Sequence, residues 1–123
     1  MSKRKSNVMR IYNTKKIGVF YRDRVRYDLT KAELIAEYWN QIASCQPGSY
    51  KENLFVTDNK NFVLYGVGNR ESKYGYRRAD GVYQDGSKYT VLSRSEAYDY
   101  LEERELLDDV TVKRFFFDLV TEG

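Results

Sequence analysis

The residue types on which most enzymes and metal sites depend are scarce in this chain. It has no histidine, which removes the commonest general base and the commonest zinc ligand. Its single cysteine, Cys45, can neither complete a thiolate zinc site nor form an internal disulfide. Adjacent carboxylates such as Glu102 and Glu103 point in different directions on a helix, which disfavours an all-carboxylate metal site. We therefore expect no catalytic residue, no metal and no cofactor, and a function that rests on binding.

A glycine-rich stretch raises the question of a nucleotide cofactor. Gly66-Val67-Gly68-Asn69-Arg70-Glu71 follows a predicted strand, as the phosphate-binding loop of a dinucleotide-binding fold does. The third glycine of that motif is missing, and no amphipathic helix follows. The stretch is better interpreted as a turn with two glycines that tolerate unusual backbone angles.

Basic residues interleaved with aromatic ones are the strongest positive signal for binding. Arg22, Arg24 and Arg26 alternate along a predicted strand, which would place their guanidinium groups about 6.5–7 Å apart on one face, near the spacing of phosphates. A second such segment contains Lys73, Tyr74, Tyr76, Arg77 and Arg78. Tyr rings in this loop could stack on bases. The alternative is a solvated face and an ordinary surface turn, and neither segment matches a named nucleic-acid motif.

The charge changes sign along the chain. Residues 1–31 carry ten Lys/Arg against two Asp, a balance of +8, and residues 32–91 balance to zero. Residues 92–123 carry nine Asp/Glu against four Lys/Arg, a balance of −5. A helix rich in carboxylates can bind a basic groove on another protein, although a solubilising helix face is the alternative. The candidates for such a protein contact are Glu96, Asp99, Glu102, Glu103, Asp108 and Asp109.

Length and composition suit one intracellular domain. The 123 residues are enough for a single core, and we expect a flexible basic arm over residues 1–7 and one domain over residues 8–123. No apolar segment follows the basic start, and purely apolar runs are far too short for a membrane span. Twelve tyrosines suit both a small core and a binding face. We expect a cytoplasmic protein.

Hydrophobic periodicity predicts the elements that must position these residues. Thr30-Lys31-Ala32-Glu33 has the pattern of a capping box and is followed by apolar residues at helical spacing, which predicts a helix to about Ser44. The other predicted elements are strands at 8–12, 17–27 and 87–92, a β-hairpin from 52–57 and 61–65, a short extended segment at 81–83, and helices at 94–105 and 110–120. This order predicts an α+β fold, a small antiparallel sheet packed with three helices.

Three segments in the middle of the chain form a pattern that resembles one in a known group of proteins. The segments are 61–68, 72–75 and 86–97, namely a strand ending in Leu-Tyr-Gly-x-Gly, a Ser-Lys-Tyr turn and a capped helix start. The pattern resembles that of small uncharacterised accessory proteins from phages and mobile elements of Firmicutes. Their helix begins with Pro-Leu-Thr-x-x-Glu-Ala, whereas the present chain has Val-Leu-Ser-Arg-Ser-Glu-Ala and lacks the proline. The resemblance covers under half of the chain and assigns no residue roles.

The resemblance implies that the protein acts in the context of host defence and its inhibition. Small accessory proteins of such elements are often inhibitors of host defence or else small regulators. The inhibitors include anti-CRISPR proteins, which occupy a nucleic-acid channel or block a conformational change. One hypothesis is therefore a non-enzymatic inhibitor that binds a protein partner, such as a CRISPR effector nuclease or its guide complex. The alternative is a nucleic-acid-binding regulator that uses the arginines of 22–26 and the loop at 73–78. Neither hypothesis requires a membrane or a small-molecule cofactor.

Overall fold

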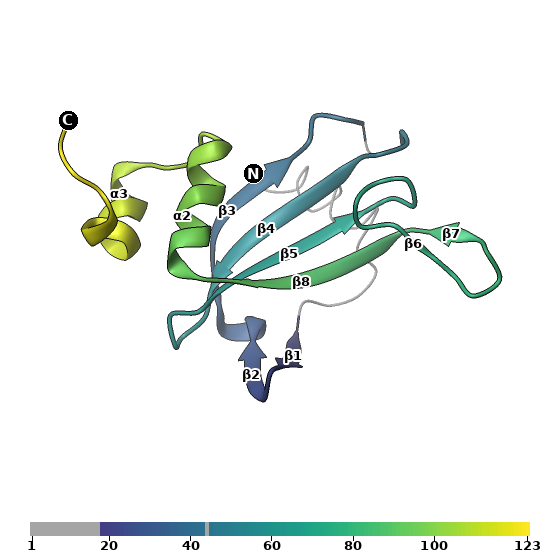
Figure 1. The fold of residues 1–123 in the computed structure, drawn as a ribbon, viewed down its shortest axis with the longest axis horizontal. Helices are drawn as coiled ribbons and strands as arrows, with labels where there is room; N and C mark the ends of the chain where they lie inside the picture. The colour runs from purple at the N-terminus through teal and green to yellow at the C-terminus, as the bar shows by residue number, and fades with distance from the viewer. Residues whose placement is uncertain (1–17, 44) are drawn as a thin grey trace.

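The computed structural model describes residues 18–43 and 45–123, with a four-stranded antiparallel sheet at its centre (Figure 1). The strands, in their order across the sheet, are β3 (Glu33–Trp39), β4 (Tyr50–Val56), β5 (Phe62–Gly68) and β8 (Gly86–Leu92). The basic arm expected over residues 1–7 and the strand expected at 8–12 lie outside the described residues.

The hairpin predicted in the middle of the chain is confirmed as β4 and β5, the two central strands. They pair without a break from Tyr50 opposite Gly68 to Val56 opposite Phe62. Both strands are buried along almost their whole length, because the sheet is covered on both faces. The strand predicted at 87–92 is confirmed as β8, which pairs with β5.

The helix predicted from Thr30 to Ser44 is wrong, because the chain forms the edge strand β3 there. A single 3-10 turn, η1 (Leu29–Lys31), precedes the strand, and its cap is Asp28, which accepts a hydrogen bond from the Thr30 amide at 2.9 Å. The Glu33 carboxylate binds the Arg114 guanidinium at 2.7 and 2.8 Å instead of closing a capping box. A β-bulge shifts the register between Leu34 and Ala36, so that neighbouring apolar residues face the same side and imitate helical spacing.

The strand predicted at 17–27 is divided into a β-hairpin in the described part of that range. Strand β1 (Val19–Arg22) pairs antiparallel with β2 (Val25–Asp28) around a turn at Asp23 and Arg24. This hairpin is a separate two-stranded sheet that extends away from the four-stranded sheet (Figure 1).

The remaining elements lie at the two ends of the four-stranded sheet (Figure 1). A third, two-stranded sheet consists of β6 (Tyr76–Arg77) and β7 (Tyr83–Gln84), near the extended segment predicted at 81–83.

Helix α2 (Arg94–Glu103) begins at the predicted capping box of Ser93 and Glu96. The last predicted helix is broken into α3 (Asp109–Thr111), a π-helical turn η2 (Val112–Phe116) and a 3-10 turn η3 (Phe117–Leu119). No helix in the described ranges is long and apolar enough to cross a membrane.

The predicted fold class, an antiparallel sheet packed with three helices, is therefore corrected. Among the described residues 38% are in strands and 23% are helical, and the strands form three sheets rather than one. Only two segments in the same residues are α-helices, and one of them is a single turn. The difference arises mainly at β3, where a strand replaces the predicted first helix.

The sheet separates two hydrophobic clusters. On one face Leu54, Val56, Phe62 and Leu64 pack against α2 and the C-terminal turns, and the same cluster includes Ala97, Tyr100, Leu101, Phe115 and Phe116. On the other face the buried residues are Phe55, Val63, Tyr65 and Val67, together with Tyr27 and Leu29 from the β2–η1 segment. Burial on both faces holds the helical end and the β1–β2 hairpin against the same sheet.

The consecutive residues Phe116 and Phe117 allow a direct test of this packing. The Phe116 side chain is fully buried and stacks on Phe62, with ring centroids 5.5 Å apart, whereas 69% of Phe117 is exposed. We expect Phe116→Ala to lower the free energy of unfolding by about 3–5 kcal/mol, because it leaves a cavity. Phe117→Ala should change it by less than about 0.5 kcal/mol. Urea denaturation of both variants measures this, and equal losses would contradict the assignment of the core.

Candidate functional site

A buried carboxylate lies at the centre of the most highly connected group of polar side chains. Glu52, on β4, is fully buried, and its Oε2 accepts a hydrogen bond from the Tyr74 hydroxyl at 2.5 Å. Its Oε1 accepts one from the Tyr100 hydroxyl at 2.6 Å. The Lys73 ammonium lies 2.7 Å from Oε2, and the Arg104 Nε lies 3.9 Å from Oε1. We call these five residues the Glu52 cluster.

Aromatic rings surround the two cations of the Glu52 cluster. The Lys73 ammonium lies 4.7 Å from the ring centroid of Tyr50, and the Arg104 guanidinium lies 3.9 Å from that of Tyr100. Arg104 also lies over the ring of Tyr38, at 5.1 Å. Cation–π contacts of this kind stabilise a charge most strongly where it has lost hydration, which applies more to Arg104 than to the half-exposed Lys73. The cations that neutralise Glu52 are therefore fixed in position on both sides of it.

The surroundings of Glu52 shift the pKa of its carboxyl in two opposing directions. Burial raises this pKa, but hydrogen bonds from Lys73, Tyr100 and Tyr74 outweigh the effect, and the pKa lies below its ordinary value of 4.5. Burial and the adjacent carboxylate raise the pKa values of the Tyr74 and Tyr100 hydroxyls well above the ordinary value of 10. Both hydroxyls thus stay protonated and continue to donate to a charged Glu52.

The two glycines of the cofactor-like motif do not form the predicted turn, because both lie within β5. Gly66 is directly opposite Glu52 in the register, and a Cβ added to it would lie 1.8 Å from Cζ of Tyr74. A Cβ on Gly68 would lie 2.2 Å from Oγ of Ser72. The missing side chains leave the space in which residues 69–75, which we call the anchoring loop, lie against the sheet.

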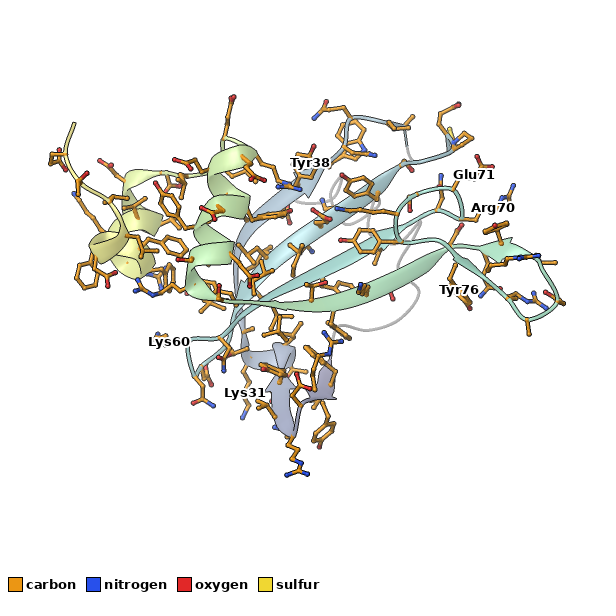
Figure 2. All side chains as sticks on the ribbon, in the orientation of Figure 1. Lys31, Tyr38, Lys60, Arg70, Glu71 and Tyr76 are labelled. Carbon is orange, nitrogen blue, oxygen red and sulfur yellow. The ribbon has the colours of Figure 1, made fainter. Side chains whose placement is uncertain are left out.

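The anchoring loop leads into a projecting two-stranded ribbon, residues 76–84, which we call the arm. The arm extends from the end of the sheet away from α2 (Figure 1). Three of its apolar side chains are half exposed: Tyr76 at 50%, Val82 at 51% and Tyr83 at 57%. Between the anchoring loop and the arm is an open hollow of about 700 Å³, and its lining includes Arg70, Glu71, Val82 and Tyr83. Figure 2 shows Arg70, Glu71 and Tyr76 at this end of the molecule.

The structure divides the basic and aromatic residues predicted at 73–78 into two groups. Lys73 and Tyr74 bind Glu52, so they are part of the anchoring of the loop, although the Lys73 side chain is still 49% exposed. Tyr76, Arg77 and Arg78 lie on the exposed surface of the arm, where Arg78 forms an ion pair with Asp80 at 2.8 Å. The second group, on the arm itself, is therefore the better placed to contact a partner.

The three arginines predicted to share one strand face do not form a ladder. Arg22, on β1, donates a hydrogen bond to the Tyr89 carbonyl at 2.9 Å. Arg24 occupies the hairpin turn, and Arg26 lies on β2, 3.8 Å from a carboxylate oxygen of Asp28. The alternation in the sequence continues through a turn, which is why it indicated one long strand.

The acidic candidates also differ from one another in role. Glu96 accepts a hydrogen bond from the Ser93 amide, and Asp108 accepts one from the Thr111 amide, so both cap helical turns. Asp99, Glu102 and Glu103 are exposed on α2, and Asp109 is exposed at the start of α3. Asp99, Glu102, Glu103 and Asp109, which cap no helical turn, remain candidates for a protein contact.

Neither the family models nor the curated proteins and solved structures compared with this chain give a match. Within residues 18–43 and 45–123, no group of three or more His, Cys, Asp or Glu side chains is arranged to hold a metal ion. The interpretation of the surface therefore depends on its geometry and charge.

Sequence reasoning missed the Glu52 cluster and the exposed pair Val82 and Tyr83 on the arm. One signal for the cluster was present, because Glu52 shares a strand face with Leu54 and Val56. A carboxylate among inward-facing apolar residues indicates a buried charge that needs partners. The identity of those partners depends on contacts across 22 and 48 residues of the chain, which local patterns do not contain.

The pKa shift of Glu52 predicts a pH dependence of stability. A carboxyl whose pKa is lowered on folding stabilises the fold above its unfolded pKa of about 4.5, and the stabilisation is lost as the pH falls through the lower folded pKa. We expect Glu52→Gln to cost about 1–3 kcal/mol at pH 7, and the difference from the wild type to shrink below pH 4.5. Denaturant unfolding at pH 7, 4 and 3 measures it. If the difference in unfolding free energy between Glu52→Gln and the wild type does not change with pH, the assignment of a charged Glu52 is wrong.

Gly66 allows a test of the packing of the anchoring loop. Gly66→Ala should displace the Tyr74 ring, weaken its hydrogen bond to Glu52 and lower stability by about 1–3 kcal/mol. Hydrogen–deuterium exchange of residues 70–75 should become faster. Gly18→Ala is the matched control, because a Cβ there would meet nothing within 4 Å. Equal effects of the two substitutions would show that close packing of the loop is not the cause.

Proposed function

We propose that this chain is a non-enzymatic binding protein that recognises another protein through its arm. The observation that carries the proposal is the exposure of Tyr76, Val82 and Tyr83 on one short ribbon. Val82 and Tyr83 line the same hollow, whereas Tyr76, opposite Gln84 in the register, lies on the other face of the ribbon from Tyr83. Exposed apolar side chains that gather as Val82 and Tyr83 do mark interaction sites more often than scattered ones do. Tyr and Arg are also the residue types that dominate the binding energy of protein interfaces.

The charges around the arm favour a protein partner over a nucleic acid. Apart from Lys73, which binds Glu52, residues 70–85 contain three arginines and three carboxylates, namely Arg70, Arg77, Arg78, Glu71, Asp80 and Asp85. A surface that binds phosphates needs an excess of positive charge, and this one has none. Arg70 and Arg77 form no ion pair among the described residues, so each is free to bind a carboxylate or carbonyl of a partner.

The arm is also suited to binding because its base is rigid. The anchoring loop is fixed by Lys73, Tyr74 and the two glycines of β5. A recognition element that is ordered before it binds loses less conformational entropy on association. The Glu52 cluster thus supports recognition without touching the partner.

For the partner itself, we propose a host defence complex such as a CRISPR effector nuclease, inhibited by stoichiometric binding in the host cytoplasm. This part of the proposal is supported by the resemblance of residues 61–68, 72–75 and 86–97 to accessory proteins of phages and mobile elements. The exposed carboxylates of α2 offer a second contact, because they would suit a basic channel of such a complex. The nucleic-acid alternative uses the arginines of residues 22–26 and the loop at 73–78, and of these two surfaces the β1–β2 hairpin is separate from the arm.

Substitutions in the arm and in α2 distinguish a partner contact through the arm from one through α2. We expect Tyr83→Ala with Val82→Ser to weaken partner binding about 30-fold or more, because truncation of hot-spot residues costs about 2 kcal/mol or more. Phe117→Ala, which truncates an exposed ring elsewhere, should leave binding unchanged. Charge reversal of Asp99, Glu102 and Glu103 to Lys tests the contact through α2. Co-purification with candidate effectors and titration of nuclease inhibition are the measurements.

Two outcomes would contradict the proposal. If the wild-type chain retains no component of a defence complex from host lysate, the proposed class of partner is wrong. If a partner binds equally well to the arm variant and to the wild type, the arm is not the recognition element. Loss of binding only on charge reversal would move the contact to α2.

A further inference from the structure

The turn of the β1–β2 hairpin has an arginine in a conformation that favours glycine. Asp23 and Arg24 are the two turn residues, and their φ angles are +52° and +67°. Two-residue hairpin turns with positive φ at both positions strongly prefer Asn-Gly or Asp-Gly. The Asp is present, but the position after it holds Arg instead of Gly. An unfavourable backbone conformation kept at an exposed tip points to a role for the side chain.

The hairpin is held firmly on its inner side. The Phe20 ring stacks between Tyr27 and Tyr89, at centroid distances of 5.0 and 4.2 Å. Arg22 donates to the Tyr89 carbonyl and also lies 5.3 Å from the Phe20 ring centroid. These contacts attach the hairpin to β8 and leave the tip at the free end.

The outer side of the hairpin combines an exposed aromatic ring with positive charge. Tyr21 is 71% exposed and is directly opposite Arg26 in the register. Arg24 has no ion pair or hydrogen bond among the described residues. Lys31 follows on η1, and Figure 2 shows Lys31 and Lys60 toward the same end of the molecule. The pKa of Glu33, the first residue of β3, is lowered mainly by its hydrogen bonds from Arg114 and to a smaller extent by the charge of Lys60.

There are fewer carboxylates than cations in this part of the chain, and some of the carboxylates already bind other groups of the protein. Asp28 accepts hydrogen bonds from the Thr30 amide and hydroxyl, and Glu33 binds Arg114. Asp23 at the tip and Asp58 beside Lys60 are the remaining acids nearby in the sequence. Residues 18–31 thus carry four basic and two acidic side chains, a balance of +2, and all of residues 1–31 carry +8.

We propose that the β1–β2 hairpin binds the phosphodiester backbone of a nucleic acid, with Arg24 contacting phosphate and Tyr21 stacking on an exposed base. A two-stranded ribbon is narrow enough to enter a nucleic-acid groove, and arginine binds phosphate through its fork of N–H groups. An adjacent aromatic ring is typical of single-strand recognition. This function is independent of the arm, so either proposal can fail alone.

The test measures binding of fluorescently labelled oligonucleotides to the full chain by anisotropy over a range of NaCl concentrations. The probes are single-stranded DNA, single-stranded RNA and duplex DNA of the same sequence. We expect binding that weakens steeply with salt. Arg24→Gly should weaken it and reduce the salt slope by about one, while the midpoint of thermal unfolding stays the same or rises. A role in stability alone would not produce this opposite pair of effects.

Substitutions on the arm and on the hairpin test whether the hairpin itself contacts the nucleic acid. Arg77→Ala, on the arm, should bind as the wild type does, whereas Arg24→Ala should not. Tyr21→Ala should weaken binding to single strands more than to duplex. The proposal is overturned if no probe binds at low salt, or if Arg24→Gly binds as tightly as the wild type. Equal losses for Arg24→Ala and Arg77→Ala, or equally tight binding of polyglutamate or anionic vesicles, would also overturn it.

Discussion

The burial of the charged Glu52 carboxylate on one face of the sheet is the constraint on which the arrangement of the other elements depends. Removing an ion from water costs several kcal/mol unless its hydrogen-bonding sites are filled. Here the two hydroxyls of Tyr74 and Tyr100 and the ammonium of Lys73 fill them. These partners come from the anchoring loop and from α2, so a single charge on β4 determines where two distant segments lie. A carboxylate in this position favours one arrangement of those segments over others that would leave it unpaired.

The glycines of β5 and β8 make that arrangement sterically possible. Gly66 leaves room for the Tyr74 ring, and a Cβ on Gly86 would lie 2.3 Å from the Tyr74 carbonyl oxygen. Gly68 and Gly86 are also direct neighbours across the two strands. At this end of the sheet the anchoring loop therefore occupies the volume that side chains fill elsewhere. The position of the arm follows from the same contacts, since the arm continues directly from this loop.

How much of the structure the sequence predicts depends on whether the signals are local. The β4–β5 hairpin, β8 and the start of α2 were predictable, because alternation, turn residues and the Ser93–Glu96 capping box act over a few residues. Strand β3 was not predictable, since a bulge imitates helical spacing and its stability comes from pairing with β4. The arginines of the β1–β2 hairpin were identified as a group. Their separation depends on a turn without glycine, which pattern reasoning does not recognise.

The arm and the β1–β2 hairpin are supported by opposite faces of one sheet. The arm depends on the Glu52 cluster, which lies on the face that packs against α2. The hairpin depends on the rings of Phe20, Tyr27 and Tyr89, which belong to the cluster on the other face. Because the two supports share no side chain, substitutions in one should have effects that add to those in the other. On the two proposals together, the chain would bind a protein at a neutral aromatic surface and a polyanion at a separate basic one.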